Sequence, residues 1–155
     1  MEKLKKFLNT KTTTSNPAET KQIGFDLAKL LKPGQVLLLE GELGTGKTTL
    51  VQGIAEGLGL SVAEKLVSPT YVYIKEYDTK PKLYHIDLYR IKNQDRELSA
   101  EINEIMQLNG LVIVEWPSRM PDIWPKDYLS IILNYKNENQ RIINFMAQGD
   151  FGKDN

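Results

Sequence analysis

The feature that most constrains this chain is the stretch at residues 41–48, which reads Gly-Glu-Leu-Gly-Thr-Gly-Lys-Thr. It fits the pattern G-x-x-x-x-G-K-S/T, which is typical of a phosphate-binding P-loop. The apolar run at residues 35–40 predicts a buried strand before it, and apolar residues at helical spacing follow it as far as Leu58. A strand, a glycine-rich loop and a helix are the context that this motif requires, so we prefer it to a chance glycine turn.

The chemistry of phosphate binding explains the residue types in this loop. Glycines let the backbone turn tightly, so that its N–H groups come close to phosphate oxygens. A helix that starts at the loop directs its unpaired N–H groups and the positive end of its dipole at the anion. Lys47 adds a positive charge near the outer phosphates, and the Thr48 hydroxyl is suited to ligate Mg²⁺. The predicted nucleotide contacts are Gly41, Glu42, Leu43, Gly44, Thr45, Gly46, Lys47, Thr48 and Thr49.

Length and composition exclude several other classes of protein. A chain of 155 residues predicts one domain, residues 1–155, with a core of useful size. Net charge is zero, which argues against nucleic-acid binding driven by bulk charge. No cysteine and a single histidine exclude disulfides and a thiol nucleophile, and they disfavour a zinc site. We find no signal-type or membrane-spanning apolar run, so we expect a cytoplasmic protein without a membrane partner.

The pattern of the remaining chain predicts the fold class. Asn16-Pro17-Ala-Glu19 is typical of a helix start, and a second helix is predicted over residues 95–108. Strands are predicted at residues 71–77, 83–87, 111–115, 128–135 and 141–147. Apolar strands separated by helices favour an α/β, P-loop NTPase-like three-layer fold, with a largely parallel central sheet plus antiparallel additions.

The two ends of the chain are less clearly patterned. Residues 1–15 predict either a short edge strand around Leu4, Phe7 and Leu8 or a flexible N-terminus. Residues 148–155 are interpreted as a polar tail.

Two acidic residues follow apolar strands, where ligands of open α/β sheets bind. Asp87 ends Leu-Tyr-His-Ile, and Glu115 ends Leu-Val-Ile-Val. A site for a nucleotide with Mg²⁺ needs an acidic group near the metal, commonly from the end of a neighbouring strand. The alternative for either residue is a solvated carboxylate at a strand end.

Other residues near these strands have two interpretations each. Ser68-Pro69-Thr70 is either a segment that senses the phosphate or a simple turn. Arg90 contacts phosphate or a partner, or else forms an exposed salt bridge. We expect His85 to be a half-buried, hydrogen-bonded histidine rather than a general base, and Trp116 to stack on a base or partner or to pack in the core. The guanine-reading Asn-Lys-x-Asp is absent, which favours an adenine nucleotide.

Four segments together resemble the bacterial TsaE family, the small ATPase of tRNA threonylcarbamoyladenosine biosynthesis. They are Gly-Glu-Leu-Gly-Thr-Gly-Lys-Thr-Thr (41–49), Ser-Pro-Thr-Tyr (68–71), His-Ile-Asp-Leu-Tyr-Arg (85–90) and Val-Glu-Trp-Pro (114–117). The resemblance covers roughly residues 16 to 147. It implies an ATPase that uses ATP and Mg²⁺, is slow alone, and acts with the TsaB and TsaD proteins and, through them, with tRNA.

The resemblance also implies roles for single residues. Thr48 and Glu115 would be Mg²⁺ ligands, and Asp87 the second acidic group of the hydrolytic site, beside Lys47. The switch or partner-side residues would be Ser68, Pro69, Thr70, Tyr71, His85, Arg90 and Trp116, and the nucleotide would also touch Asn16 and Pro17. The competing hypotheses are a small-molecule phosphotransferase on the same fold and a nucleotide-dependent interaction module without useful turnover.

Overall fold

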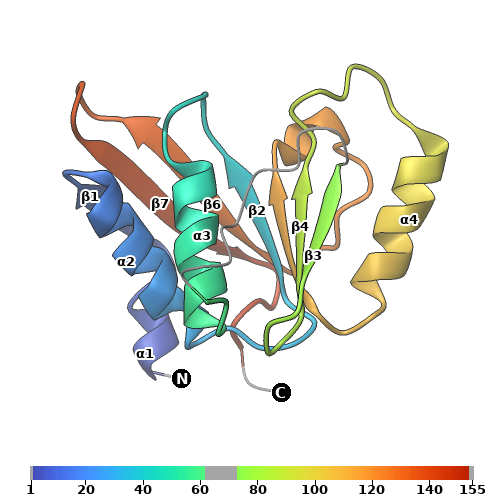
Figure 1. Ribbon diagram of the computed structural model, residues 1–155, viewed down its shortest axis with the longest axis horizontal. Helices are drawn as coiled ribbons and strands as arrows, with labels where there is room; N and C mark the ends of the chain where they lie inside the picture. Colours follow the sequence, from blue (N-terminus) through green and yellow to red (C-terminus); the bar gives the residue numbers. More distant parts are fainter. Residues whose placement is uncertain (1, 62–72, 154–155) are drawn as a thin grey trace.

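The computed structural model describes residues 2–61 and 73–153, which form one seven-stranded sheet with helices on its faces (Figure 1). The helices are α1 (Glu2–Lys5), α2 (Pro17–Ala28), α3 (Lys47–Gly57), α4 (Arg96–Met106) and the 3₁₀ turn η1 (Pro117–Arg119). The strands are β1 (Thr10–Thr14), β2 (Val36–Glu40), β3 (Ile74–Tyr77), β4 (Leu83–Asp87), β5 (Leu111–Glu115), β6 (Tyr128–Tyr135) and β7 (Arg141–Gln148).

The strand order is β1-β7-β6-β2-β5-β4-β3. The four central strands β6, β2, β5 and β4 pair in parallel, and β1, β7 and β3 are added in antiparallel pairing. The predicted fold class, a largely parallel sheet with antiparallel additions, is therefore confirmed. In this order β2 lies between β6 and β5, so the loop that follows β2 has neighbours on both sides.

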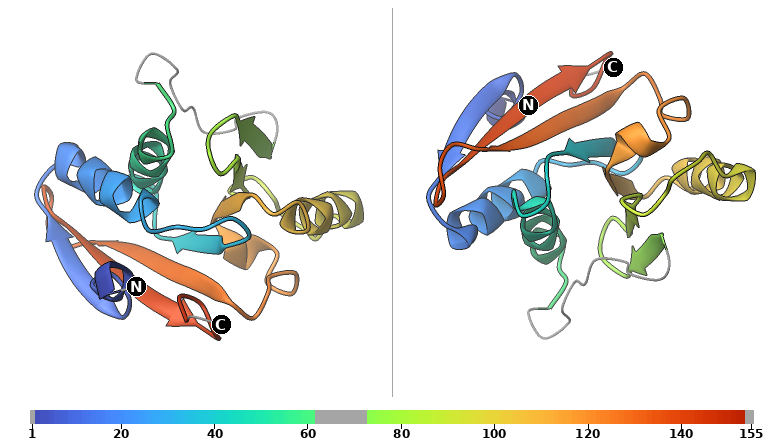
Figure 2. Two further views of the ribbon diagram at one scale, coloured as in Figure 1. Left: turned by 90° about the horizontal axis from the view of Figure 1, so that it is seen from below. Right: turned by 90° about the horizontal axis from the view of Figure 1, so that it is seen from above.

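Both faces of the central sheet are covered, which explains the continuous apolar runs of its strands. Along β2, Leu37 and Leu39 belong to the core under α2 and α3, whereas Val36 and Leu38 belong to the core under α4. The two helices α2 and α3 lie side by side on one face, apart from α4 (Figures 1 and 2). The arrangement is the three-layer one expected from the sequence.

Glycines allow α2 and α3 to approach closely, and this contact sets the position of the helix that follows the P-loop. A Cβ added at Gly53 would lie 2.0 Å from the carbonyl oxygen of Lys21. One added at Gly24 would lie 2.3 Å from that of Leu50. The start of α2 is fixed as predicted, because the Asn16 side chain accepts a hydrogen bond from the backbone N–H of Glu19 at 2.9 Å.

The chain ends differ from the sequence-based expectation. Leu4 lies in α1, and the edge strand is β1, where the alternating threonines pair with β7. The C-terminal segment is not wholly polar, since Phe151 is buried in the core that also contains Leu4. Apolar residues of the two ends thus contribute to one core, with Phe7 and Leu8 packed against it. Over the described ranges, no helix is both long enough and apolar enough to cross a bilayer.

Candidate functional site

The P-loop joins β2 to α3 at the carboxyl end of the parallel strands. Gly46 is the N-cap of α3, with φ of +103°, a conformation that a residue with a side chain rarely adopts. Thr45 is buried, and its hydroxyl donates to the backbone carbonyl of Glu42 at 2.8 Å. Sequence and structure therefore agree on a tight loop that leads directly into a helix N-terminus.

Lys47 is folded back onto the loop. Its ammonium group donates to the carbonyl oxygens of Gly41 and Glu42, the latter at 2.9 Å, and lies 4.5 Å from the centre of the Trp116 ring. Burial lowers the pKa of Lys47, and nearby Glu115, Asp87 and Glu40 act in the opposite direction. The ammonium group is therefore buried and held by neutral carbonyl oxygens of the loop itself.

Glu115 is held between a hydroxyl and an imidazole. The Thr48 hydroxyl donates to the two carboxylate oxygens of Glu115, at 3.2 and 3.4 Å. On the other side, Nε2 of His85 lies 2.5 Å from Oε2, and since a carboxylate accepts, we assign the proton to Nε2. His85 is fully buried, which corrects the expectation of a half-buried side chain: β3 covers the outer edge of β4, so β4 is an interior strand. His85 thus orients Glu115 and does not reach the cleft.

Asp87 lies beside Glu115 because the two are register partners on β4 and β5. Its Oδ1 accepts from the backbone N–H of Tyr89 at 3.1 Å. Burial raises the pKa of Asp87, with the nearby Glu115 carboxylate as the second cause. The two carboxylates at this sheet edge therefore repel each other, and the nearby Lys47 ammonium group offsets part of that repulsion.

Burial of Asp87, together with its proximity to Glu115, predicts that Asp87→Asn stabilises the protein when no metal ion is bound. Since the folded-state pKa of Asp87 is raised above 3.8, the carboxylate costs stability at neutral pH, and that cost disappears as pH falls through the raised pKa and is absent below 3.8. We expect a gain of up to about 1 kcal/mol at pH 7, because the half-exposed group is partly screened.

The measurement is thermal unfolding in EDTA at pH 7 and near pH 3.5, with the exposed Asp122→Asn as control. An equal gain at both pH values would contradict the electrostatic explanation.

These groups line a cleft of about 370 Å³, which is within the range of small-molecule sites. Its lining consists of Leu43, Gly44, Gly46, Lys47, Thr48, Thr49, Asp87, Tyr89, Glu115 and Trp116. Within residues 2–61 and 73–153, no group of three or more His, Cys, Asp or Glu could hold a metal by itself. A metal ion held by Thr48 and Glu115 would therefore need further oxygen atoms from a molecule bound in the cleft.

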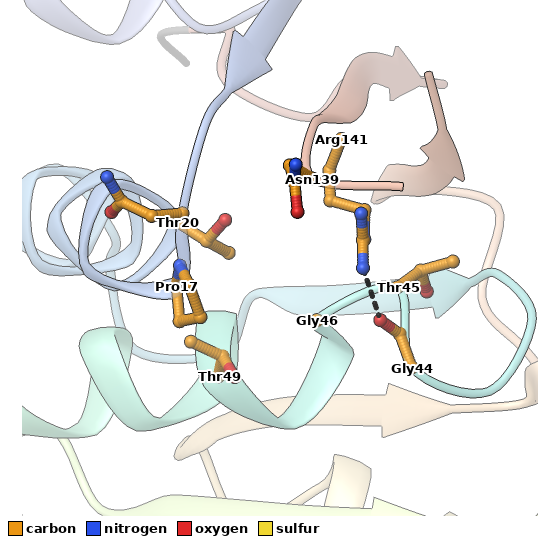
Figure 3. Close-up of a pocket in the computed structure, with 9 residues that line it drawn as sticks. Pro17, Thr20, Gly44, Thr45, Gly46, Thr49, Asn139 and Arg141 are labelled. Carbon is orange, nitrogen blue, oxygen red and sulfur yellow. Dashed lines mark hydrogen bonds between the residues drawn. The ribbon is translucent and has the colours of Figure 1, made fainter. Parts of the chain in front are cut away.

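A second, smaller cavity is lined partly by the same loop (Figure 3). Gly44, Gly46 and Thr49 line both cavities. The remaining walls are Asn16, Pro17 and Thr20 from the start of α2, together with Thr45, Asn139 and Arg141. The sequence predicts Asn16 and Pro17 at the nucleotide but not Asn139 and Arg141, because nothing in the sequence places the β6–β7 turn beside the P-loop. Thr20 was missed too, although it follows Pro17 by three residues on the same helix, and this helical spacing could have indicated it.

The other predicted residues are placed as follows. Trp116 adopts φ of +60° and packs against Tyr89, with ring centres 5.1 Å apart. Glu42 is exposed and lines neither cavity, and Arg90 is likewise exposed and outside both. The segment Ser68, Pro69, Thr70 and Tyr71 lies outside the described residues. The structure thus brings together the P-loop, both strand-end acids and Trp116, but not Arg90.

The sheet order and the loop define a P-loop NTPase-like domain. A family model described as "Threonylcarbamoyl adenosine biosynthesis protein TsaE" matches residues 14–143, and the chain therefore belongs to the TsaE family.

Individual relatives agree with this assignment. The chain is 41% identical to the tRNA threonylcarbamoyladenosine biosynthesis protein TsaE of Bacillus subtilis, over 90% of this chain and 87% of that protein. It is 43% identical to the protein of the same name from Nostoc sp., over 85% of this chain and 82% of the relative. The crystal structure of Bacillus subtilis YdiB superposes with a TM-score of 0.77 at 38% identity, covering 91% of this chain and 86% of that one.

Proposed function

We propose that this protein is the ATP-binding and ATP-hydrolysing component of the machinery that makes threonylcarbamoyladenosine in tRNA, coupling hydrolysis to turnover of a TsaB–TsaD complex. Family membership supports the role in this modification. The observation that carries the ATPase activity is the convergence of Lys47, Thr48 and Glu115 in one cleft. Phosphoryl transfer requires a positive charge near the phosphates, a hydroxyl that ligates the metal ion and an acid at a strand end. Lys47, Thr48 and Glu115 supply these three in that order.

The two cavities suggest how ATP lies across the loop. The larger cleft, with Lys47 and both acids, would take the outer phosphates. The smaller cavity, beside Thr49 and the start of α2, would take the nucleoside, with Asn16 and Pro17 against it. Arg141 lines this second cavity and adds positive charge there. The adenine specificity is proposed from the absence of a guanine-reading motif in the sequence.

The residues at the metal position fit Mg²⁺. A hydroxyl and a carboxylate oxygen already lie 3.2 Å apart, and both are hard oxygen ligands. Thr48 and Glu115 would hold the ion, which, when bound, neutralises charge that develops on the phosphates. Among the protein groups, Lys47 binds phosphate oxygens, His85 keeps Glu115 in place, and Asp87 acts as the second acidic group, through the metal ion or the attacking water.

The test is phosphate release from ATP by the wild type and by Glu115→Gln. The amide keeps the shape of the side chain but removes the negative charge, so we expect turnover with Mg²⁺ to fall by about 10²-fold or more. Binding of ATP in EDTA should change little, because the loop amides and Lys47 are intact.

The matched control is Glu101→Gln, an exposed glutamate on α4, which should behave like the wild type. If Glu115→Gln hydrolyses ATP normally, the acid is structural and the proposed metal site is wrong.

A further inference from the structure

The turn of the β6–β7 hairpin is rigidly built. The Asn137 side chain accepts hydrogen bonds from the backbone N–H groups of Asn139 and Gln140, at 3.0 and 2.9 Å. Nη1 of Arg141 donates to the carbonyl oxygens of Asn137, Glu138 and Gln140, at 3.4, 3.1 and 3.1 Å. The guanidinium group is therefore fixed by its own turn before any ligand is considered.

Two side chains of this hairpin reach consecutive peptide groups of the P-loop. The Tyr135 hydroxyl donates to the carbonyl oxygen of Leu43 at 2.5 Å. Nη2 of Arg141 donates to the carbonyl oxygen of Gly44 at 3.4 Å, the contact drawn in Figure 3. The guanidinium carbon of Arg141 also lies 4.3 Å from the centre of the Tyr135 ring, so the two side chains form one unit.

The packing between hairpin and loop leaves little space. A Cβ added at Gly44 would lie 2.6 Å from the Tyr135 hydroxyl, and φ of Gly44 is +80°. At the start of the loop, a Cβ added at Gly41 would lie 2.5 Å from the carbonyl oxygen of Leu133 on β6. Because the loop touches β6 along its length, its backbone cannot turn without losing contacts with the hairpin.

Because a peptide group is planar, a hydrogen bond to its carbonyl oxygen also fixes the direction of the N–H group in the same peptide. In a trans peptide the C=O of one residue and the N–H of the next point in opposite directions. Because the Tyr135 hydroxyl holds the Leu43 carbonyl, the Gly44 N–H points away from Tyr135. The following peptide is held at both ends, since Arg141 binds the Gly44 carbonyl and the Thr45 N–H donates to Glu42 at 3.3 Å.

We propose that Tyr135 and Arg141 are positioning residues, which preset the direction of the P-loop peptide groups for phosphate binding. This inference rests on the proposed ATP site but concerns residues outside the P-loop motif and the strand-end acids. Pre-orienting donors avoids an ordering cost when the ligand binds, so loss of the hydroxyl should weaken the binding of phosphates in particular.

The test compares Tyr135→Phe with the wild type, using two ligands that separate the parts of ATP. Inorganic tripolyphosphate has phosphates without a nucleoside, and adenosine has a nucleoside without phosphates. Each would be titrated as a competitor of a fluorescent ATP analogue. We expect Tyr135→Phe to weaken tripolyphosphate binding by about tenfold, the value of one good hydrogen bond, and to leave adenosine binding unchanged.

The control is Tyr128→Phe, which makes the same chemical change at the opposite end of β6. Thermal unfolding of both variants reports general damage. Arg141→Lys gives a second test, because a lysine keeps the charge but cannot span the turn carbonyls and the loop. The double variant Tyr135→Phe/Arg141→Lys should lose little more tripolyphosphate affinity than whichever single variant loses more, since the two side chains act together.

Three results would overturn the inference. Tyr135→Phe could bind tripolyphosphate like Tyr128→Phe, or it could lose adenosine and tripolyphosphate equally, or the losses in the double variant could be fully additive. If the wild type itself bound neither ligand nor ATP, the proposed function would fail instead, which is a separate outcome.

Discussion

Replacing Lys47 with alanine should weaken ATP binding by roughly 10- to 100-fold and lower turnover by about a further 10²–10³-fold. The side chain is buried at a junction of loop and helix, where its partners are loop carbonyls and not the apolar core. In the proposed ATP site, a charge in this position would stabilise the phosphates in both the bound state and the transition state. The folded structure should persist, because the main cores lie under α2, α3 and α4.

Calorimetric titration with ATP and a phosphate-release assay measure the two losses. Lys92→Ala, which removes an exposed lysine outside both cavities, is the control. Since burial lowers the pKa of Lys47, wild-type affinity for ATP should fall as pH rises through that value, whereas the variant should lack this dependence. A Lys47→Ala protein with unchanged affinity would refute the P-loop assignment.

The fold was largely predictable because its signals are local. Periodicity predicted β2 to β7 and α2 to α4, the capping residue Asn16 predicted the start of α2, and an acid after an apolar run marked the carboxyl ends of β4 and β5. The helix α1 was not predicted, and β1 lies further along the chain than expected. Carboxyl ends of parallel strands meet at one edge, so the convergence of Asp87 and Glu115 follows once the strands are taken as parallel.

The parts that were missed depend on which elements become neighbours. Sequence patterns show that β6 and β7 form a hairpin, but not that β6 pairs with β2. Only that pairing brings Tyr135 and Arg141 to the P-loop. The burial of His85 was underestimated for the same reason, because its exposure depends on β3 and β5 enclosing β4.

Among the described residues, the cleft is short of groups that fast hydrolysis usually needs. His85, the only histidine in the sequence, is buried and bonded to Glu115, so it is not available as a base toward water in the cleft. Among the described residues that line the cleft there is no arginine, although the guanidinium carbon of Arg119 lies 5.3 Å from the ring centre of Trp116, which lines it. Phosphoryl transfer depends on such charges, and an element supplied in trans raises turnover by roughly 10³–10⁵-fold in P-loop systems.

We therefore predict that the isolated protein hydrolyses ATP slowly and that a TsaB–TsaD complex accelerates it by at least about tenfold, toward the range seen when a missing charge is supplied in trans. The coupling should be reciprocal, since a nucleotide that changes the affinity for a partner must have its own affinity changed by that partner. The measurements are ATP turnover against increasing TsaB–TsaD, and binding of the complex with ATP, with ADP and without nucleotide. Lys47→Ala, assayed with the complex, shows whether the stimulated turnover arises in this cleft. A fast isolated ATPase, indifferent to the complex in both rate and binding, would contradict the prediction, because its cleft would then already contain every group that hydrolysis needs.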